Sequence, residues 1–182
     1  MYFTNMAAEG STYERELKNL LSGESKAISR VIKTCEAGEK EAYGSMIDEP
    51  FLVIRAAGSL GVDLVALRWD FSFPIEVKSS NSDTLHFSRN PRLGEQASQM
   101  LSDCQKSNLV PIYAFRLKRV RGDPWRVFTI PSDDEFRGLN KLLKRRIPEI
   151  ETSSNGNYIM RWEDGMKLSD FISYMHVSRG SD

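Results

Sequence analysis

Two short apolar runs constrain this chain more than any other feature. Residues 62–69 read Val-Asp-Leu-Val-Ala-Leu-Arg-Trp, and residues 73–78 read Phe-Pro-Ile-Glu-Val-Lys. Runs of this length predict β-strands, and the short connector between them predicts a hairpin. Because strand side chains alternate between faces, Glu76 and Lys78 emerge together while Val77 enters the core. Asp63, near the start of the first strand, then lies close to Glu76.

This set of side chains suits metal-assisted cleavage of a phosphodiester. Mg²⁺ takes oxygen ligands and usually binds through one or two carboxylates plus substrate phosphate. A lysine beside them positions a water or steadies the charge on the phosphate. Three simpler alternatives stay open: a turn cap for Asp63, a solvent-facing position for Glu76, and for Lys78 an exposed ion pair worth about 0.2–1 kcal/mol.

The sequence around these residues resembles a known family. Asp63 with Glu76-Val77-Lys78 is similar to the PD-(D/E)xK motif of restriction-endonuclease-like nucleases. Three further stretches resemble archaeal Holliday junction resolvases in order and content: Gly-Ser-Thr-Tyr-Glu-Arg-Glu-Leu at 10–17, Val-Ile-Arg-Ala-Ala-Gly-Ser at 53–59 and Val-Asp-Leu-Val-Ala at 62–66. The resemblance covers residues 10–21 and 51–130, with a weaker echo at 158–175.

The resemblance implies a role for each matching residue. It implies a catalytic set of Glu14, Asp63, Glu76 and Lys78. It implies metal ligands at Glu14, Asp63, Glu76 and the backbone carbonyl of Val77, and DNA contacts at Arg15, Arg55 and Ser59. For Glu14 the local sequence offers an alternative, because Ser11-x-x-Glu14 also fits a helix capping box.

The function that follows is a Mg²⁺-dependent, structure-selective DNA endonuclease, and most specifically a Holliday junction resolvase. Mn²⁺ is expected to substitute for Mg²⁺, and no nucleotide cofactor is expected. The implied partners are a four-way DNA junction and a second copy of the chain, in a homodimer that suits a two-fold branched substrate. The alternatives are another DNA repair or restriction nuclease of the same fold, or a non-catalytic DNA-binding protein.

The expected fold is α/β and restriction-endonuclease-like, with a central mixed five-stranded sheet flanked by helices. Strands are predicted at 51–56, 62–69, 73–78, 110–115 and 125–130, and a helix at 93–107. The first helix is expected to start at Ser11 or Thr12 after a loose tail at 1–10. We expect one nuclease domain over 1–182, in which residues 132–182 form an extension with a helix at 132–146, a strand at 158–162 and a helix at 168–175.

Residues 22–50 depart from the family pattern by separating the first helix from the first strand. An insertion at the surface is the simplest interpretation, since loop closure costs little extra with length. On that interpretation, a Gly/Ser linker in place of residues 24–48 would preserve cleavage. An apolar stripe through Ala27, Ile28, Val31 and Ile32 implies, however, that the segment packs against its own core or a second subunit.

Charge and composition set broader limits. The chain carries 25 basic and 25 acidic residues, so any nucleic-acid surface depends on how its charges are distributed. Basic residues cluster at 116–121 and at 141–146; a solvated face explains either cluster, and we favour it for the second. The two cysteines, the absence of an apolar run of membrane length and the absence of a signal-peptide pattern lead us to expect a cytoplasmic protein without a membrane partner.

Overall fold

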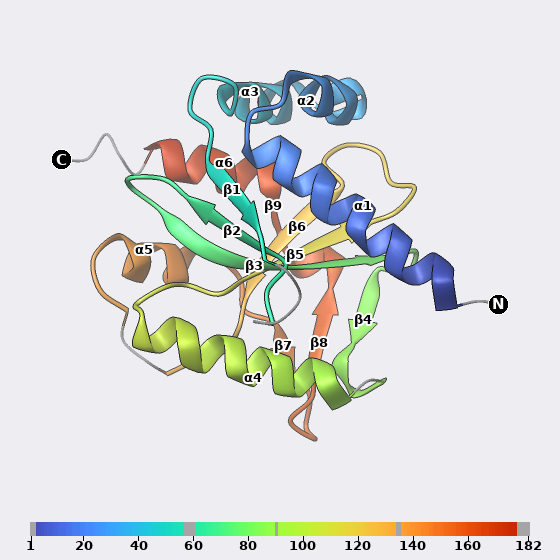
Figure 1. The fold of residues 1–182 in the computed structure, drawn as a ribbon, viewed down its shortest axis with the longest axis vertical. Helices are drawn as coiled ribbons and strands as arrows, with labels where there is room; N and C mark the ends of the chain where they lie inside the picture. Colours follow the sequence, from blue (N-terminus) through green and yellow to red (C-terminus); the bar gives the residue numbers. More distant parts are fainter. Residues whose placement is uncertain (1–2, 57–60, 90, 134–135, 178–182) are drawn as a thin grey trace.

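The computed structural model describes residues 3–56, 61–89, 91–133 and 136–177 (Figure 1). Its centre is a six-stranded mixed sheet. The strands follow in the spatial order β1 (Leu52–Arg55), β2 (Leu64–Leu67), β3 (Ser72–Ser80), β5 (Ile112–Leu117), β6 (Trp125–Thr129) and β9 (Met166–Lys167). Neighbours are antiparallel except β3 and β5, which run parallel. The mixed sheet flanked by helices is confirmed, and β9 adds a sixth strand at its edge.

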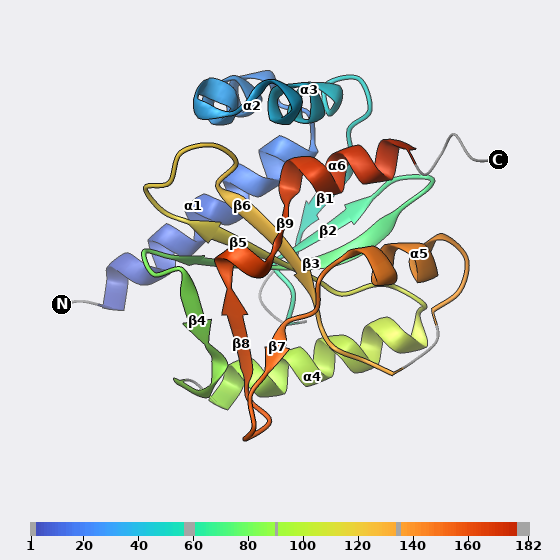
Figure 2. The same cartoon turned by 180° about the vertical axis from the view of Figure 1, so that it is seen from behind.

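Helices cover both faces of this sheet. The helices α1 (Phe3–Leu21) and α6 (Leu168–Val177) lie on one face, while α4 (Pro91–Lys106) connects β3 to β5 across the other (Figures 1 and 2). A second, three-stranded sheet joins α4 on that face and consists of β4 (Thr84–His86), β8 (Tyr158–Arg161) and β7 (Glu151–Thr152).

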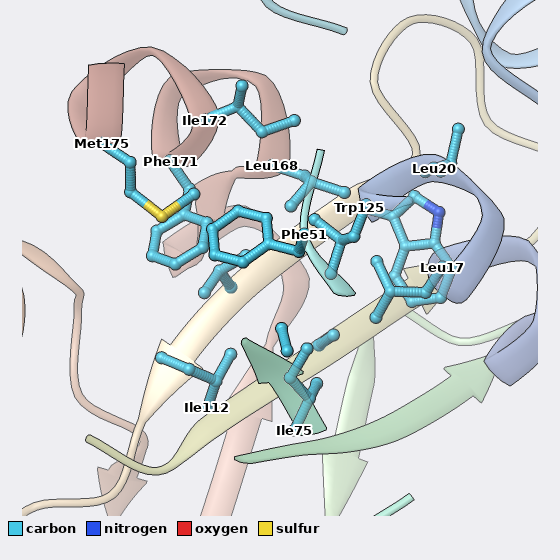
Figure 3. Close-up of a cluster of buried hydrophobic side chains, with 14 of the residues drawn as sticks. Leu17, Leu20, Phe51, Ile75, Ile112, Trp125, Leu168, Phe171, Ile172 and Met175 are labelled. Atoms are coloured by element: carbon cyan, nitrogen blue, oxygen red, sulfur yellow. The ribbon is translucent and has the colours of Figure 1, made fainter. Parts of the chain in front are cut away.

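Strand alternation divides the core between the two faces. Ile112 and Ala114 pack in the cluster beneath α1 and α6, whereas Tyr113 and Phe115 pack in the cluster beneath α4. Figure 3 shows the first cluster, in which side chains from α1, the sheet and α6 meet around Trp125. The same alternation decides which face each candidate site residue reaches.

The N-terminal helix begins earlier than the sequence predicts. The structure has α1 starting at Phe3, so the loose tail expected at 1–10 and the helix start at Ser11 or Thr12 are wrong for the described residues. Extending a helix that is already nucleated costs little, and Met6, Ala7 and Ala8 are favourable helix residues. Glu14 therefore lies inside the helix rather than in its first turn.

The segment 22–50 is part of the main core. It forms α2 (Ser25–Val31), a 3₁₀ turn η1 (Ile32–Thr34) and α3 (Ala37–Ser45). Ile28, Tyr43 and Met46 are at most 2% exposed and belong to the cluster beneath α1 and α6. The interpretation as a surface insertion is therefore wrong, because the apolar stripe packs against the chain's own core.

The C-terminal part matches the prediction except at its start. The helix predicted at 132–146 is α5 (Leu139–Arg146), and residues 136–138 precede it without helical structure. Phe136 is 5% exposed in the core, and Gly138 has a φ of 57°, which breaks helical geometry before α5 begins. The predicted strand and final helix are present as β8 and α6.

The remaining elements are two 3₁₀ turns, η2 (Phe87–Arg89) and η3 (Trp162–Asp164). Within the described ranges, no helix is both long enough and apolar enough to cross a membrane. The assignment of residues 1–182 to a single domain stays a prediction.

Candidate active site

Asp63 is fixed at the point where three strands meet. Its backbone N–H donates to the carbonyl of Ile75 (3.0 Å), and its own carbonyl accepts from the N–H of Ala56 (2.9 Å). The side-chain Oδ2 accepts from the backbone N–H of Val77 at 2.7 Å. The donor lies within β3 rather than in a turn, so this bond holds Asp63 against the neighbouring strand and is not a turn cap.

Glu76 and Lys78 lie side by side on β3, as the alternation predicts. Glu76 is 6% exposed, and the Nζ of Lys78 donates to its Oε1 at 2.6 Å. Val77 points to the opposite face and packs against the cluster beneath α1. Glu76 does not face solvent, so the solvent-facing alternative is excluded for this residue.

The carboxyl groups of the half-buried Asp63 and the buried Glu76 lie next to each other. Burial raises the pKa of Glu76, Lys78 opposes that shift and Asp63 adds to it, and together they bring the pKa to about 7. Burial also raises the pKa of Asp63, and Glu14 adds to that shift. Two adjacent carboxyl groups do not both ionise readily in a low-dielectric site. The pair therefore retains a proton near neutral pH unless a cation compensates its charge.

Glu14 lies on α1, which covers the other face of the sheet (Figure 1). Its Oε2 accepts from Nη2 of Arg55 at 2.5 Å. By strand alternation, Arg55 lies on the α1 face and Asp63 on the α4 face. This arrangement explains why no group of three or more His, Cys, Asp or Glu side chains in the described part of the chain is close enough to hold a metal ion. The ligand role implied for Glu14 stays a prediction.

The remaining oxygen ligands, from Asp63, Glu76 and the carbonyl of Val77, nonetheless fit a hard divalent cation. A strand residue directs its N–H and C=O to the same side, so the carbonyl of Val77 shares the side on which its N–H meets Asp63. Two carboxylates and one carbonyl are oxygen ligands of the kind that Mg²⁺ accepts, with water and phosphate completing its shell.

The residues implied in DNA contact have different surroundings. Arg15 is exposed on α1, while Arg55 is partly exposed and pairs with Glu14. Ser59 lies outside the described residues. Their proposed contacts with DNA stay predictions.

Two features of the site's surroundings escape the sequence analysis. Tyr113 is the register partner of Glu76, is 1% exposed and forms part of the buried surroundings. Alternation at 112–115 places Tyr113 on one face, but the parallel β3–β5 register is needed to set it beside Glu76. Arg116, assigned to a possible solvated cluster, instead donates to Glu16 at 2.9 Å. The 100 residues between that pair leave no local signal.

No family model matches this chain, and no curated protein sequence matches it either. Among solved structures, the chain is similar to Hjc of Archaeoglobus fulgidus, a Holliday junction resolvase from an archaeal hyperthermophile. The sequence identity is 18% and the TM-score is 0.47, over 74% of this chain and 92% of that one. The similarity is distant, and the substrate named for that enzyme is a property of that enzyme.

Proposed function

We propose that this protein is a divalent-metal-dependent DNA endonuclease that cuts branched DNA, with the four-way junction as its main substrate. One observation carries the proposal: Glu76 is buried beside the half-buried Asp63, with Lys78 on the same face. Perturbed acids gathered in this way are typical of functional sites. The motif order at 10–17, 53–59 and 62–66, which resembles Holliday junction resolvases, supports the choice of substrate.

Asp63, Glu76 and the carbonyl of Val77 would hold the cation, which we propose is Mg²⁺ with Mn²⁺ as a substitute. Asp63 keeps one oxygen for this purpose, since the N–H of Val77 occupies the other. A bound divalent cation supplies Lewis-acid stabilisation of the phosphate and lowers the pKa of its water. Its charge favours ionisation of both carboxyl groups, which burial opposes.

Lys78 and the Glu14–Arg55 pair complete the proposed site. With a divalent cation held by Glu76, the ammonium of Lys78, which donates to that carboxylate at 2.6 Å, would be available to position the attacking water or a phosphate oxygen. A phosphate beside Arg55 would compete with Glu14 for the guanidinium, which binds phosphate through paired hydrogen bonds. Glu14 would then be available as a further oxygen ligand.

We also propose that the protein acts as a homodimer, since a two-fold junction presents two equivalent strands. On α4, Met100 and Cys104 are at most 4% exposed and pack within the chain, so they are unavailable to a partner. Exposed apolar side chains lie instead on the edge strand β1, where Leu52 is 66% and Ile54 is 49% exposed. Sedimentation velocity over a range of concentrations tests the dimer.

A cleavage assay tests the function. The purified protein is incubated with Mg²⁺, with Mn²⁺ or with EDTA, on a four-way junction and on a linear duplex of the same sequence. Metal-dependent, paired cuts in the junction, with little cutting of the duplex, are the expected result. Equal cleavage of both would indicate a different DNA nuclease. Binding without cleavage in either metal would indicate a non-catalytic DNA-binding protein.

A further inference from the structure

A cleft of about 410 Å³ lies beside α1, between α2 and the loop from β5 to β6. Figure 1 shows these three segments next to one another, away from α4. The part of α1 that lines the cleft is one helical stripe: Thr12, Arg15, Glu16 and Asn19. Glu14 is two residues from Thr12 and Glu16 and so points away from this stripe, towards Arg55.

The acidic groups of the cleft are already satisfied by the protein. Glu16 Oε1 accepts from the guanidinium of Arg116 (2.9 Å) and from the indole N–H of Trp125 (3.0 Å). Glu24 caps α2 by accepting from the backbone N–H groups of Lys26 (3.2 Å) and Ala27 (2.9 Å). Neither carboxylate is needed by, or directed at, the remaining cations of the cleft.

Those remaining cations are Arg15, Lys26 and Arg30. All three are exposed and line the cleft. None of them pairs with an acidic side chain in the part of the chain that the structure describes. The cleft therefore carries uncompensated positive charge, although the whole chain has a net charge of zero.

The walls of the cleft are held in place before any ligand arrives. The N–H of Gly122, in the loop between β5 and β6, donates to the hydroxyl of Thr34 at 3.2 Å. The cationic groups of Arg116 and Lys118 lie 5.4 and 5.5 Å from the ring centre of Tyr13. None of the described residues that line the cleft is aromatic, so the cleft offers no ring for stacking with a base.

We propose that this cleft binds the phosphate backbone of DNA outside the cleavage site, an inference that rests on the proposed endonuclease function. Arginine and lysine without acidic partners suit phosphate oxygens, and the lack of a free stacking ring favours backbone over base recognition. Arg15 follows Glu14 on α1, with Cα atoms about 3.8 Å apart, so the cleft adjoins the Glu14–Arg55 pair of the candidate site. The segment that supplies Lys26 and Arg30 lies outside the resemblance to resolvases.

The test uses two matched double variants of the full chain. Lys26→Gln with Arg30→Gln removes two cleft cations four residues apart on α2. Lys141→Gln with Arg145→Gln removes two exposed cations at the same spacing on α5, away from the cleft. Fluorescence anisotropy measures Kd for a labelled junction in EDTA over a range of salt concentrations, and thermal melting checks that each variant is folded.

For the α2 variant we expect a roughly tenfold weaker Kd and a fall of about 2 in the slope of log Kd against log salt, because each neutralised phosphate contributes about 0.9. The α5 variant should keep the wild-type slope. Equal slopes for wild type and both variants would overturn the assignment of the cleft. If wild type still cleaves DNA, the proposed endonuclease function would stand. An acidic protein partner in the cleft would also give an unchanged slope. Wild type that neither binds nor cleaves DNA would overturn the proposed function itself.

Discussion

Two buried carboxylate clusters differ in how their oxygens are satisfied. Asp123 is 2% exposed, and its oxygens accept from the hydroxyl of Tyr43 (2.8 Å) and the N–H groups of Trp125 (3.0 Å) and Ser169 (2.8 Å). Among the residues that the structure describes, Glu76 receives a single donor, Lys78, and faces a second carboxyl group, Asp63. Asp123 and Glu76 are buried to a similar extent, at 2% and 6% exposed, so the missing donors, rather than burial, distinguish the candidate site.

We call Asp123 and its three hydrogen-bond donors the saturated cluster, and this cluster also connects the segment 22–50 to the sheet. Tyr43 on α3, Trp125 on β6 and Ser169 on α6 all donate to Asp123. The unsaturated pair, Asp63 and Glu76, has no such link between distant elements, since Asp63 directly precedes β2 and Glu76 lies on the neighbouring strand β3. The comparison therefore predicts that changes at the first cluster affect stability, whereas changes at the second affect chemistry.

The largest expected effect follows from deleting the segment that carries Tyr43, one of the donors to Asp123. Replacing residues 24–48 with a Gly/Ser linker removes the buried Ile28, Tyr43 and Met46. Each such side chain contributes about 2–5 kcal/mol, so the loss is comparable to the whole stability of a typical domain, about 5–15 kcal/mol. We expect a protein without a cooperative melting transition, as measured by circular dichroism and limited proteolysis. A shortened protein that melts cooperatively would restore the interpretation as a surface insertion.

The next largest effect tests the unsaturated pair. Asp63→Asn and Glu76→Gln should each reduce cleavage about 10³-fold or more, because both side chains act through the cation. Lys78→Ala should cost about 10²-fold. Single-turnover cleavage measures the rates, while circular dichroism in EDTA should show that each variant folds and melts cooperatively, with DNA affinity near wild type. Glu95→Gln, at an exposed carboxylate on α4, is the matched control and should cleave normally. Near-normal cleavage by either acid variant would contradict the metal-site assignment.

The sequence predicts the pair but not the saturated cluster, for a physical reason. Glu76 and Lys78 share one strand, and a connector of four residues (68–71) brings Asp63 alongside, so local alternation is enough. Tyr43 and Asp123 are separated by 80 residues, and no local pattern encodes their contact.

The predicted starts of two helices were wrong because packing or helix extension, rather than a local pattern, determines where those helices begin. The first part of α1 extends a helix that is favourable in its own right, so α1 begins at Phe3. The capping pattern at Ser11 wrongly indicated a later start. Residues 136–138 read as helix, but burial of Phe136 and the positive φ of Gly138 displace the start of α5. The face of each site residue was predictable, whereas the pairing of Glu14 with Arg55 across the chain was not.

A smaller effect is expected when Asp123 loses its charge but keeps its shape. Asp123→Asn replaces one acceptor with a donor, so at least one of its three donors loses its partner. Leaving a buried donor unsatisfied costs about 1–3 kcal/mol, and a broken buried charge network costs up to about 5 kcal/mol. Urea unfolding should show a loss of about 3–4 kcal/mol. Tyr43→Phe should cost only about 1 kcal/mol, because two backbone donors remain.

Cleavage per folded molecule should be unchanged in both of these variants, which separates the saturated cluster from the candidate site. An Asp123→Asn protein with normal stability and lost cleavage would reverse the assignment of the two clusters.

The smallest effect concerns stability at the candidate site itself. Because burial raises the pKa of Glu76 from its ordinary 4.5 to about 7, the folded protein favours the protonated form. That contribution is fully present below about pH 4.5 and is lost as pH rises through 7. Glu76→Gln keeps the position neutral at every pH. In EDTA, the variant should therefore be more stable than wild type at pH 8, by about 3 kcal/mol, and nearly equal to it at pH 4.5.

Urea unfolding at the two pH values measures this difference. The same measurement is then repeated with Mg²⁺ in place of EDTA. A cation that binds the ionised pair should stabilise wild type at pH 8 and have little effect on Glu76→Gln, so the gap between them should close. Glu95→Gln should show neither effect, because its carboxylate is exposed. Wild type more stable than Glu76→Gln at pH 8 in EDTA would mean that Lys78 already satisfies Glu76. The carboxylates of the two clusters would then be equally well satisfied. The missing donors at Glu76 would no longer indicate a cation site that lowers the stability of the protein.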